Sequence, residues 1–142
     1  MSTHPPAPTL YHAVVWMDHR EARIIHFDAE TSTRTVVHAH HTPSHLHHKA
    51  HSVGSGHTGV DQQYFRDLAT ALGAAGCIVV TGPGSAKNDW CKFLQTHQPA
   101  MSERIAGVQA LDHPSDGELL AFARKYVHGA DQMRSQRLPN NA

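Results

Sequence analysis

Residues 77–90 read CIVVTGPGSAKNDW, an apolar run that leads through a Gly-Pro-Gly turn into the start of a helix. The run over 77–81 predicts a central strand, because it is almost entirely apolar. Ser85 stands where a helix N-cap is expected, and a helix is predicted over 85–97. A buried strand that turns directly into a helix is typical of an α/β domain.

The same turn has two interpretations. Free backbone N–H groups at a helix start favour an anion, and Lys87 lies in the first helical turn, so a phosphate would suit this position. A Walker loop is excluded, because the G-x-x-x-x-G-K-[ST] spacing is absent. A tight strand-to-helix turn without a ligand is the alternative, and the spacing leaves both interpretations open.

The remaining elements complete an α/β order. On the N-terminal side, the runs at 11–17, 22–27 and 33–40 predict three strands joined by short connections, which favours an antiparallel meander. A helical period from Val60 to Leu72 precedes the central strand. On the C-terminal side we expect a strand at 104–111 and a last helix. The order β-β-β-α-β-α-β-α predicts an α/β fold with a mixed five-stranded sheet and helices packed on it.

The last helix has clear boundary signals. Ser115 and Glu118 form an S-x-x-E capping box at its start, and Gly129 is the expected stop. A single domain over 10–129 is therefore predicted. Residues 1–9 contain three prolines and no signal-peptide core, and we expect a disordered leader there. The polar residues 130–142 are expected to be a mobile tail.

Composition limits the classes of partner. The chain has 142 residues, with 12 Lys and Arg against 12 Asp and Glu, so it is formally neutral when its 15 histidines are neutral. A neutral chain has no strong overall attraction to nucleic acid or anionic membranes, and any basic face must be local. We expect no DNA or membrane partner. Cys77 and Cys91 are expected to be buried thiols in a reducing cytoplasm.

Histidines gather in one segment without apolar periodicity, residues 41–59, which we call the histidine-rich segment and expect to be a long loop. Neutral imidazole binds zinc and nickel well. No structural zinc spacing or H-E-x-x-H motif is present, so three interpretations stay open: a solvated loop, a metal site, or a loop that meets RNA phosphates when protonated. The candidate metal ligands are His38, His40, His45, His47 and His51.

Catalytic motifs are weak. A G-x-S-x-G elbow is absent, and Cys77 lies in an apolar run. The pair Asp18 and His19 is explained by turn chemistry. Asp18, Asp112 and Asp116 follow or precede predicted strand ends and could meet as nuclease carboxylates do, if the strand order allowed it. The sequence favours a protein that is not an enzyme.

Several motifs in order suggest a family. A Gly-rich stretch at 54–59 precedes a helix that begins with Tyr64-Phe65-Arg66, and the strand ending in residues 81–84 is followed by Lys87 and the helix with Trp90. Together with the hairpin at 14–27, this arrangement resembles the middle domain of archaeal and eukaryotic peptide-chain release factors and of Pelota. Similar short bacterial proteins are grouped as release-factor-like. The resemblance implies a ribonuclease-H-like α/β fold and a role in translation.

One departure bears on activity. Release factors carry Gly-Gly-Gln in the long loop before the first helix, where the glutamine places water at the peptidyl-tRNA ester. Here residues 54–59 read GSGHTG, and Gln62 and Gln63 fall in the predicted helix. Pelota-like rescue factors also lack Gly-Gly-Gln. The resemblance therefore implies a cytoplasmic protein that binds the ribosome or tRNA and does not catalyse peptide release.

The candidate contacts to RNA phosphate combine the histidine-rich segment with two supporting cations. They are His47, His48, Lys49, His51, His57, Arg66 and Lys87. A zinc- or nickel-binding protein is the first alternative; otherwise no cofactor is expected. An esterase acting on peptidyl-tRNA, with His57 as its base, is the second.

Overall fold

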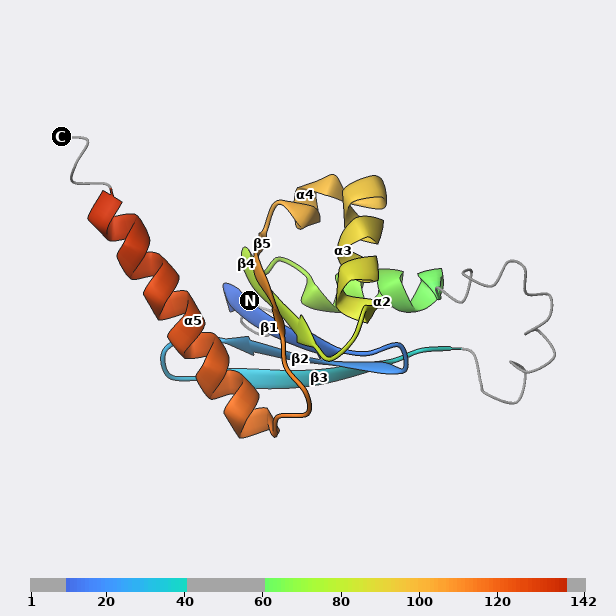
Figure 1. Ribbon diagram of the computed structural model, residues 1–142, viewed down its shortest axis with the longest axis horizontal. Helices are drawn as coiled ribbons and strands as arrows, with labels where there is room; N and C mark the ends of the chain where they lie inside the picture. The colour runs from blue at the N-terminus through green and yellow to red at the C-terminus, as the bar shows by residue number, and fades with distance from the viewer. Residues whose placement is uncertain (1–9, 41–60, 138–142) are drawn as a thin grey trace, which may run out of the picture.

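The computed structural model describes residues 10–40 and 61–137, with side chains described as far as residue 129. Five strands form one sheet in the order β3-β2-β1-β4-β5 (Figure 1). The antiparallel pairs β1–β2 and β2–β3 make the predicted meander. β4 pairs in parallel with β1, and β5 pairs in parallel with β4. The predicted mixed five-stranded sheet is confirmed. The strands are β1 (His12–Met17), β2 (Glu21–Phe27), β3 (Ser32–His38), β4 (Cys77–Gly82) and β5 (Ile105–Ala110).

Helices cover both faces of this sheet. One core joins alternate residues of β1, such as Val15, to Leu68 of α2 and Trp90 of α3. The opposite core joins Val14 and its alternate neighbours to Leu119 of α5. Because β1 and β4 are covered on both sides, their sequences are apolar without alternation. The helices are α2 (Gln62–Leu72), α3 (Ala86–His97), α4 (Pro99–Ser102) and α5 (Asp116–Arg137).

The capping box of α5 is confirmed. The backbone N–H of Ser115 donates to Glu118 Oε1 at 2.9 Å, and the N–H of Glu118 donates to Ser115 Oγ at 3.1 Å. The predicted stop at Gly129 is wrong, because α5 continues to Arg137 and includes the first part of the expected tail. A glycine inside a helix lowers its stability without necessarily ending it, and Leu119, Ala123 and Val127 pack the first part of α5 onto the sheet.

Two further predictions need correction, and one helix was not predicted. The side chain of Ser85 makes no hydrogen bond to the α3 N-terminus, although it occupies the N-cap position. Cys77 and Cys91 are half-buried thiols and not fully buried, and burial raises the pKa of Cys91. The short helix α4 was not expected. The helix α2 begins after its N-cap Asp61, and the segment before it lies outside the described residues.

The Gly-Pro-Gly turn brings two strand ends close together. Gly82 ends β4 with a φ of +149°, and a Cβ atom on it would lie 2.1 Å from the carbonyl oxygen of Met17 at the end of β1. Only glycine permits this approach. The start of α3 is thereby fixed beside the β1–β2 turn.

Candidate functional site

Four connections meet at one end of the sheet, near the end of β3 and the start of α2 (Figure 1, right). The backbone N–H of Ala39 donates to Arg20 O at 2.8 Å. The buried hydroxyl of Tyr64 donates to Asp18 O at 2.8 Å. We call this region the loop end of the sheet, and it comprises residues 18–21, 38–40, 61–67 and 85–89.

Asp61 joins the two sides of the histidine-rich segment. One carboxylate oxygen accepts a hydrogen bond from the backbone N–H of His40 at 2.9 Å. The other oxygen caps α2 by accepting from the backbone N–H of Tyr64, also at 2.9 Å. One side chain therefore fixes the points at which the segment leaves the sheet and enters the helix.

His40 makes a second contact with α2. Its Nε2 lies 2.6 Å from Asp67 Oδ2, and the other carboxylate oxygen of Asp67 accepts from Gln63 at 2.8 Å. The hydrogen bond to Asp67 raises the pKa of His40. The same bond, together with the one from Gln63, lowers the pKa of Asp67. Both shifts favour the charged pair.

Two other histidines at the loop end also face carboxylates. His19 Nε2 lies 3.3 Å from Asp89 Oδ2, and His38 Nδ1 lies 3.8 Å from Glu21 Oε1. While these histidines are neutral, the described carboxylates of the loop end outnumber its cations, so this surface is not basic. Protonation of the histidines reverses the balance. The carboxylates are Asp18, Glu21, Asp61, Asp67 and Asp89, and the cations are Arg20, Arg66 and Lys87.

The two predicted supporting cations differ in exposure. Arg66 is exposed and donates to Gln63 Oε1 at 3.0 Å within its own helix. Lys87 is only 8% exposed, and its Nζ donates to the carbonyl oxygen of Gly84. The ammonium of Lys87 thus stabilises the Gly-Pro-Gly turn, which agrees with the structural interpretation of that turn. The other candidate phosphate contacts, at positions 47, 48, 49, 51 and 57, lie outside the described residues.

The predicted metal ligands are only partly described. His38 and His40 belong to different ion pairs, with Glu21 and Asp67. Within residues 10–40 and 61–137, no group of three or more His, Cys, Asp or Glu side chains could hold a metal ion. This also excludes a carboxylate cluster of Asp18, Asp112 and Asp116 in that part of the chain. His45, His47 and His51 lie outside the described residues, so their role in binding zinc or nickel stays a prediction.

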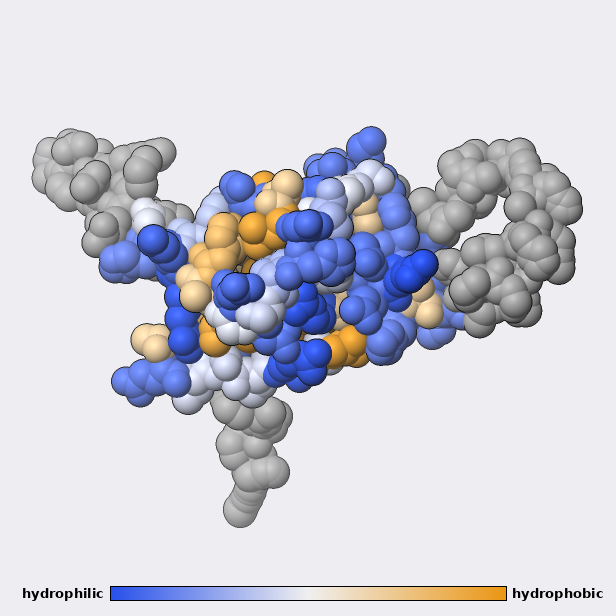
Figure 2. Space-filling model, turned by 60° about the horizontal axis from the view of Figure 1, so that its bottom comes forward, coloured by the Kyte–Doolittle hydropathy of each residue, from blue (hydrophilic) through white to orange (hydrophobic). Residues whose placement is uncertain are grey.

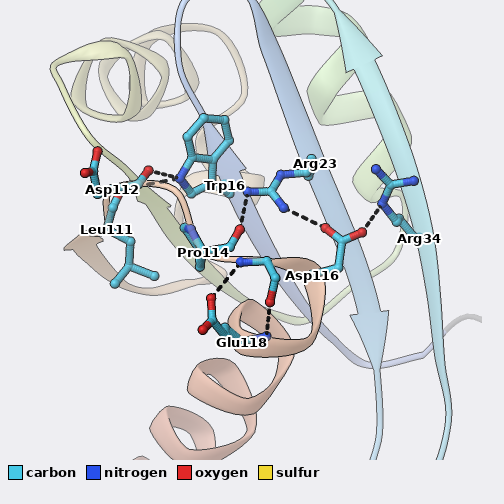
Figure 3. Close-up of polar contacts among 9 residues, drawn as sticks. Trp16, Arg23, Arg34, Leu111, Asp112, Pro114, Asp116 and Glu118 are labelled. Atoms are coloured by element: carbon cyan, nitrogen blue, oxygen red, sulfur yellow. Dashed lines mark hydrogen bonds and ion pairs between the residues drawn. The ribbon is translucent and has the colours of Figure 1, made fainter.

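A polar network that the sequence did not reveal joins α5 to the other face of the sheet (Figure 3). The guanidinium of Arg23 lies 4.9 Å from the Trp16 ring centroid and donates to Asp116 Oδ1 at 2.6 Å and to Pro114 O at 2.8 Å. Arg34 contacts the second oxygen of Asp116 at 2.6 Å. Trp16 and Arg23 are register partners across β1 and β2, a cross-strand pairing that could have indicated the cation–π contact.

The molecular surface is mixed. Figure 2 shows a face on which hydrophilic side chains predominate, with separate hydrophobic areas between them. None of the helices in the described part of the chain is long and apolar enough to cross a lipid bilayer.

Neither a protein-family profile nor the sequence of a curated protein matches the chain. Several solved structures are similar to it in fold. Pelota from Archaeoglobus fulgidus is 15% identical with a TM-score of 0.57, and the match covers 82% of this chain and 31% of that one. Pelota from Thermoplasma acidophilum is 18% identical with a TM-score of 0.55, covering 80% of this chain and 32% of that one.

An archaeal translation termination factor is also similar in structure. It is 10% identical with a TM-score of 0.55, and the match covers 89% of this chain and 40% of that one. The chain thus spans less than half the length of each of these proteins. At such low identity the likeness concerns the fold, which is the ribonuclease-H-like fold implied by the sequence resemblance.

Proposed function

We propose that this protein acts in translation by binding the ribosome or tRNA, in the cytoplasm, and that it does not catalyse peptide release. The main support is the position of the histidine-rich segment. It lies between β3 and α2 in a fold shared with Pelota and an archaeal translation termination factor. In the release factors that the sequence resembles, the long loop before the first helix holds the functional Gly-Gly-Gln.

The composition of the segment suits RNA phosphate. Residues 41–59 contain six histidines and Lys49 and no Asp or Glu. Protonated imidazoles would add positive charge there, and each phosphate contact would release counterions, so binding would weaken with salt. At the loop end of the sheet, a protonated His40 forms an ion pair with Asp67. Its positive charge offsets that of a carboxylate that would otherwise repel RNA.

The missing glutamine argues against peptide release. Residues 54–59 contain no Gly-Gly-Gln. Gln62 and Gln63 begin α2, and the Gln63 amide is held by Asp67. Neither glutamine therefore has the place on a loop that release chemistry would require.

Sucrose-gradient fractionation at low salt and pH 6.5 tests the proposal. We expect the protein to sediment with ribosomes and to be released by added salt. A variant with His47, His48, Lys49 and His51 replaced by asparagine should stay at the top of the gradient. A control with Lys125 and His128 replaced by asparagine should still sediment, because both residues are exposed on α5, which packs on the opposite face of the sheet from α2. If the wild type stays at the top, the proposal fails. Stoichiometric zinc or nickel that survives dialysis of untagged protein would favour the metal-binding alternative.

A further inference from the structure

The outer edge of β3 is open in the part of the chain that the structure describes. β3 is the last strand on its side of the sheet, with β2 as its neighbour (Figure 1, cyan). Its sequence, STRTVVH, is rich in the β-branched residues that favour strands and contains no Pro, Asp or Glu. Its two ionisable side chains already face carboxylates of the same chain, since Arg34 contacts Asp116 and His38 lies 3.8 Å from Glu21. An edge of this kind can pair with another strand.

The opposite edge strand, β5, is less suited to such pairing. Its register with β4 shifts between Ile78 and Val79. A bulge interrupts the regular row of outward backbone groups that a further strand would need. The register of β2 with β3 has no such shift over the whole of β3. The regular edge of the sheet is therefore the β3 edge.

Hydrogen bonds at both ends of β3 show which of its backbone groups face outward. The N–H of Ala39 donates to Arg20 O at 2.8 Å, and the N–H of Asp28 donates to Thr31 O at 3.0 Å. Bonded and non-bonded pairs alternate in an antiparallel ladder, so the odd-numbered residues from 31 to 39 face β2. The N–H and C=O groups of the even-numbered residues point away from the sheet. These residues are Ser32, Arg34, Val36 and His38.

We propose that two copies of this chain pair through β3 in an antiparallel arrangement, with Thr35 directly opposite Thr35 of the second copy. The outward-facing residues lie symmetrically about residue 35, so all of them find partners. Ser32 lies opposite His38 of the second copy, and Arg34 opposite its Val36. These pairs give about eight backbone hydrogen bonds. The result is a continuous sheet of about ten strands, within the range of known open sheets.

The proposed register also keeps like charges apart. A shift by two residues in one direction would place Arg34 opposite Arg34 of the second copy, and a shift in the other direction would place it opposite His38. Like charges directly opposite one another destabilise a strand pair. In the proposed register Arg34 meets a valine instead, and no outward group of either strand is left without a partner.

Charge complementarity favours a second copy as the partner. The turn that enters β3 carries the exposed side chains of Asp28 and Glu30, whereas β3 itself has no acidic residue and ends at His38. Antiparallel pairing brings the acidic turn of each copy beside the histidine end of the other, and the two-fold axis repeats this contact. Parallel pairing would instead bring the two acidic turns together. Each copy thus offers the charge that the edge of the other lacks.

The two-fold symmetry of the pairing gives a sharp test. Because Thr35 is exposed and faces its own copy, Thr35→Lys or Thr35→Glu would each place two like charges directly opposite one another. An equimolar mixture would instead place the introduced lysine opposite the introduced glutamate. Thr33→Lys is the matched control, because Thr33 is also exposed but lies opposite Val37 of the second copy.

The measurement is sedimentation equilibrium at pH 6.5 over a concentration series of the full chain, a pH of about the ordinary histidine pKa. We expect the wild type and Thr33→Lys to reach twice the 15.6 kDa mass of the chain. Each variant of Thr35 alone should raise the dissociation constant about fivefold or more, and the mixture should restore dimers. Recovery in the mixture also shows that both variants are folded.

Three results would overturn the proposal. They are a wild type that is monomeric at every concentration, a Thr35→Lys variant that dimerises like the wild type, and a mixture of the two charged variants that stays monomeric. The pairing does not rest on ribosome binding, so the failure of one proposal leaves the other intact.

Discussion

Asp61 Oδ2 accepts a hydrogen bond from the backbone N–H of His40 at 2.9 Å across the base of the histidine-rich segment. These two residues are far apart in the sequence, and the contact joins the end of β3 to the start of α2. Because Asp61 also caps α2, the helix and the segment depend on one carboxylate. This carboxylate therefore holds the end of β3 against the start of α2.

Substitution of Asp61 separates these two roles. We predict that Asp61→Ala loses both hydrogen bonds and destabilises the protein by about 1 kcal/mol or more. Asp61→Asn keeps an oxygen that can cap α2 but has no second acceptor for His40, so it should be less destabilised. Urea unfolding measures the stability of both variants. Equal loss of stability in the two variants would show that the cap is not the main contribution.

The pair of His40 and Asp67 predicts a defined pH dependence. The pKa of His40 is raised from 6.5, so its contribution to stability is complete below that value and is lost as the pH rises through the higher folded pKa. The pKa of Asp67 is lowered from 3.8, so its contribution is present above that value and is lost as the pH falls through the lower folded pKa. The pair is therefore fully charged between those two ordinary values.

NMR titration of the His40 imidazole tests this relationship. In Asp67→Asn, the pKa of His40 should fall toward its ordinary value, because the charged acceptor is gone. Asp89→Asn is the control, since Asp89 contacts His19 instead. An unchanged pKa of His40 in Asp67→Asn would contradict the assigned cause.

Two arginines that share Asp116 should differ in their effect on stability. The side chain of Arg23 is 13% exposed and also donates to Pro114 O, whereas that of Arg34 is 52% exposed. We predict that Arg23→Ala costs about 2 kcal/mol, because the part-buried hydrogen bonds of a charged guanidinium and its contact with Trp16 are lost. Arg34→Ala should cost less than about 1 kcal/mol, as exposed ion pairs do. Thermal or urea unfolding of the two variants measures their loss of stability. Equal losses would contradict the larger contribution assigned to Arg23.

The Gly-Pro-Gly turn offers another matched pair. Gly82→Ala should destabilise the protein by about 3 kcal/mol or more, because the Cβ atom would meet the Met17 carbonyl at a positive φ. A Cβ on Gly84 would meet nothing within 4 Å, so Gly84→Ala should be nearly neutral by the same unfolding assay. A tolerated Gly82→Ala would mean that β1 and β4 can separate at this end.

The sequence was most informative where local signals and burial agree. The apolar run of β4 and the capping box of Ser115 and Glu118 depend on neighbouring residues, so both could be predicted. The stop at Gly129 was predicted wrongly, because a glycine alone does not say whether a helix continues. The likeness to release factors and Pelota was correctly read at the level of the fold, since the order of elements carries it.

The candidate site was less predictable, because its contacts cross the chain. The pairing of His40 with Asp67 joins a strand end to a helix, and no spacing rule indicates it. Lys87 was expected to face a phosphate from its position near a helix start. That role stays a prediction; in the structure its ammonium donates to the carbonyl oxygen of Gly84, an acceptor whose direction depends on the turn conformation. The contact of Arg23 with Asp116 likewise depends on how α5 crosses the sheet.

Ribosome affinity and thermal stability, both measured at pH 8 and pH 6, test the central claim most directly. If the histidine-rich segment binds RNA phosphate, affinity should rise steeply at pH 6 and fall with added salt, because protonation adds charge that releases counterions. The thermal midpoint should not fall, since the histidines of the segment are expected to be solvated and the pair of His40 and Asp67 is favoured at the lower pH. A large loss of thermal stability at pH 6 without a gain in ribosome binding would contradict the account.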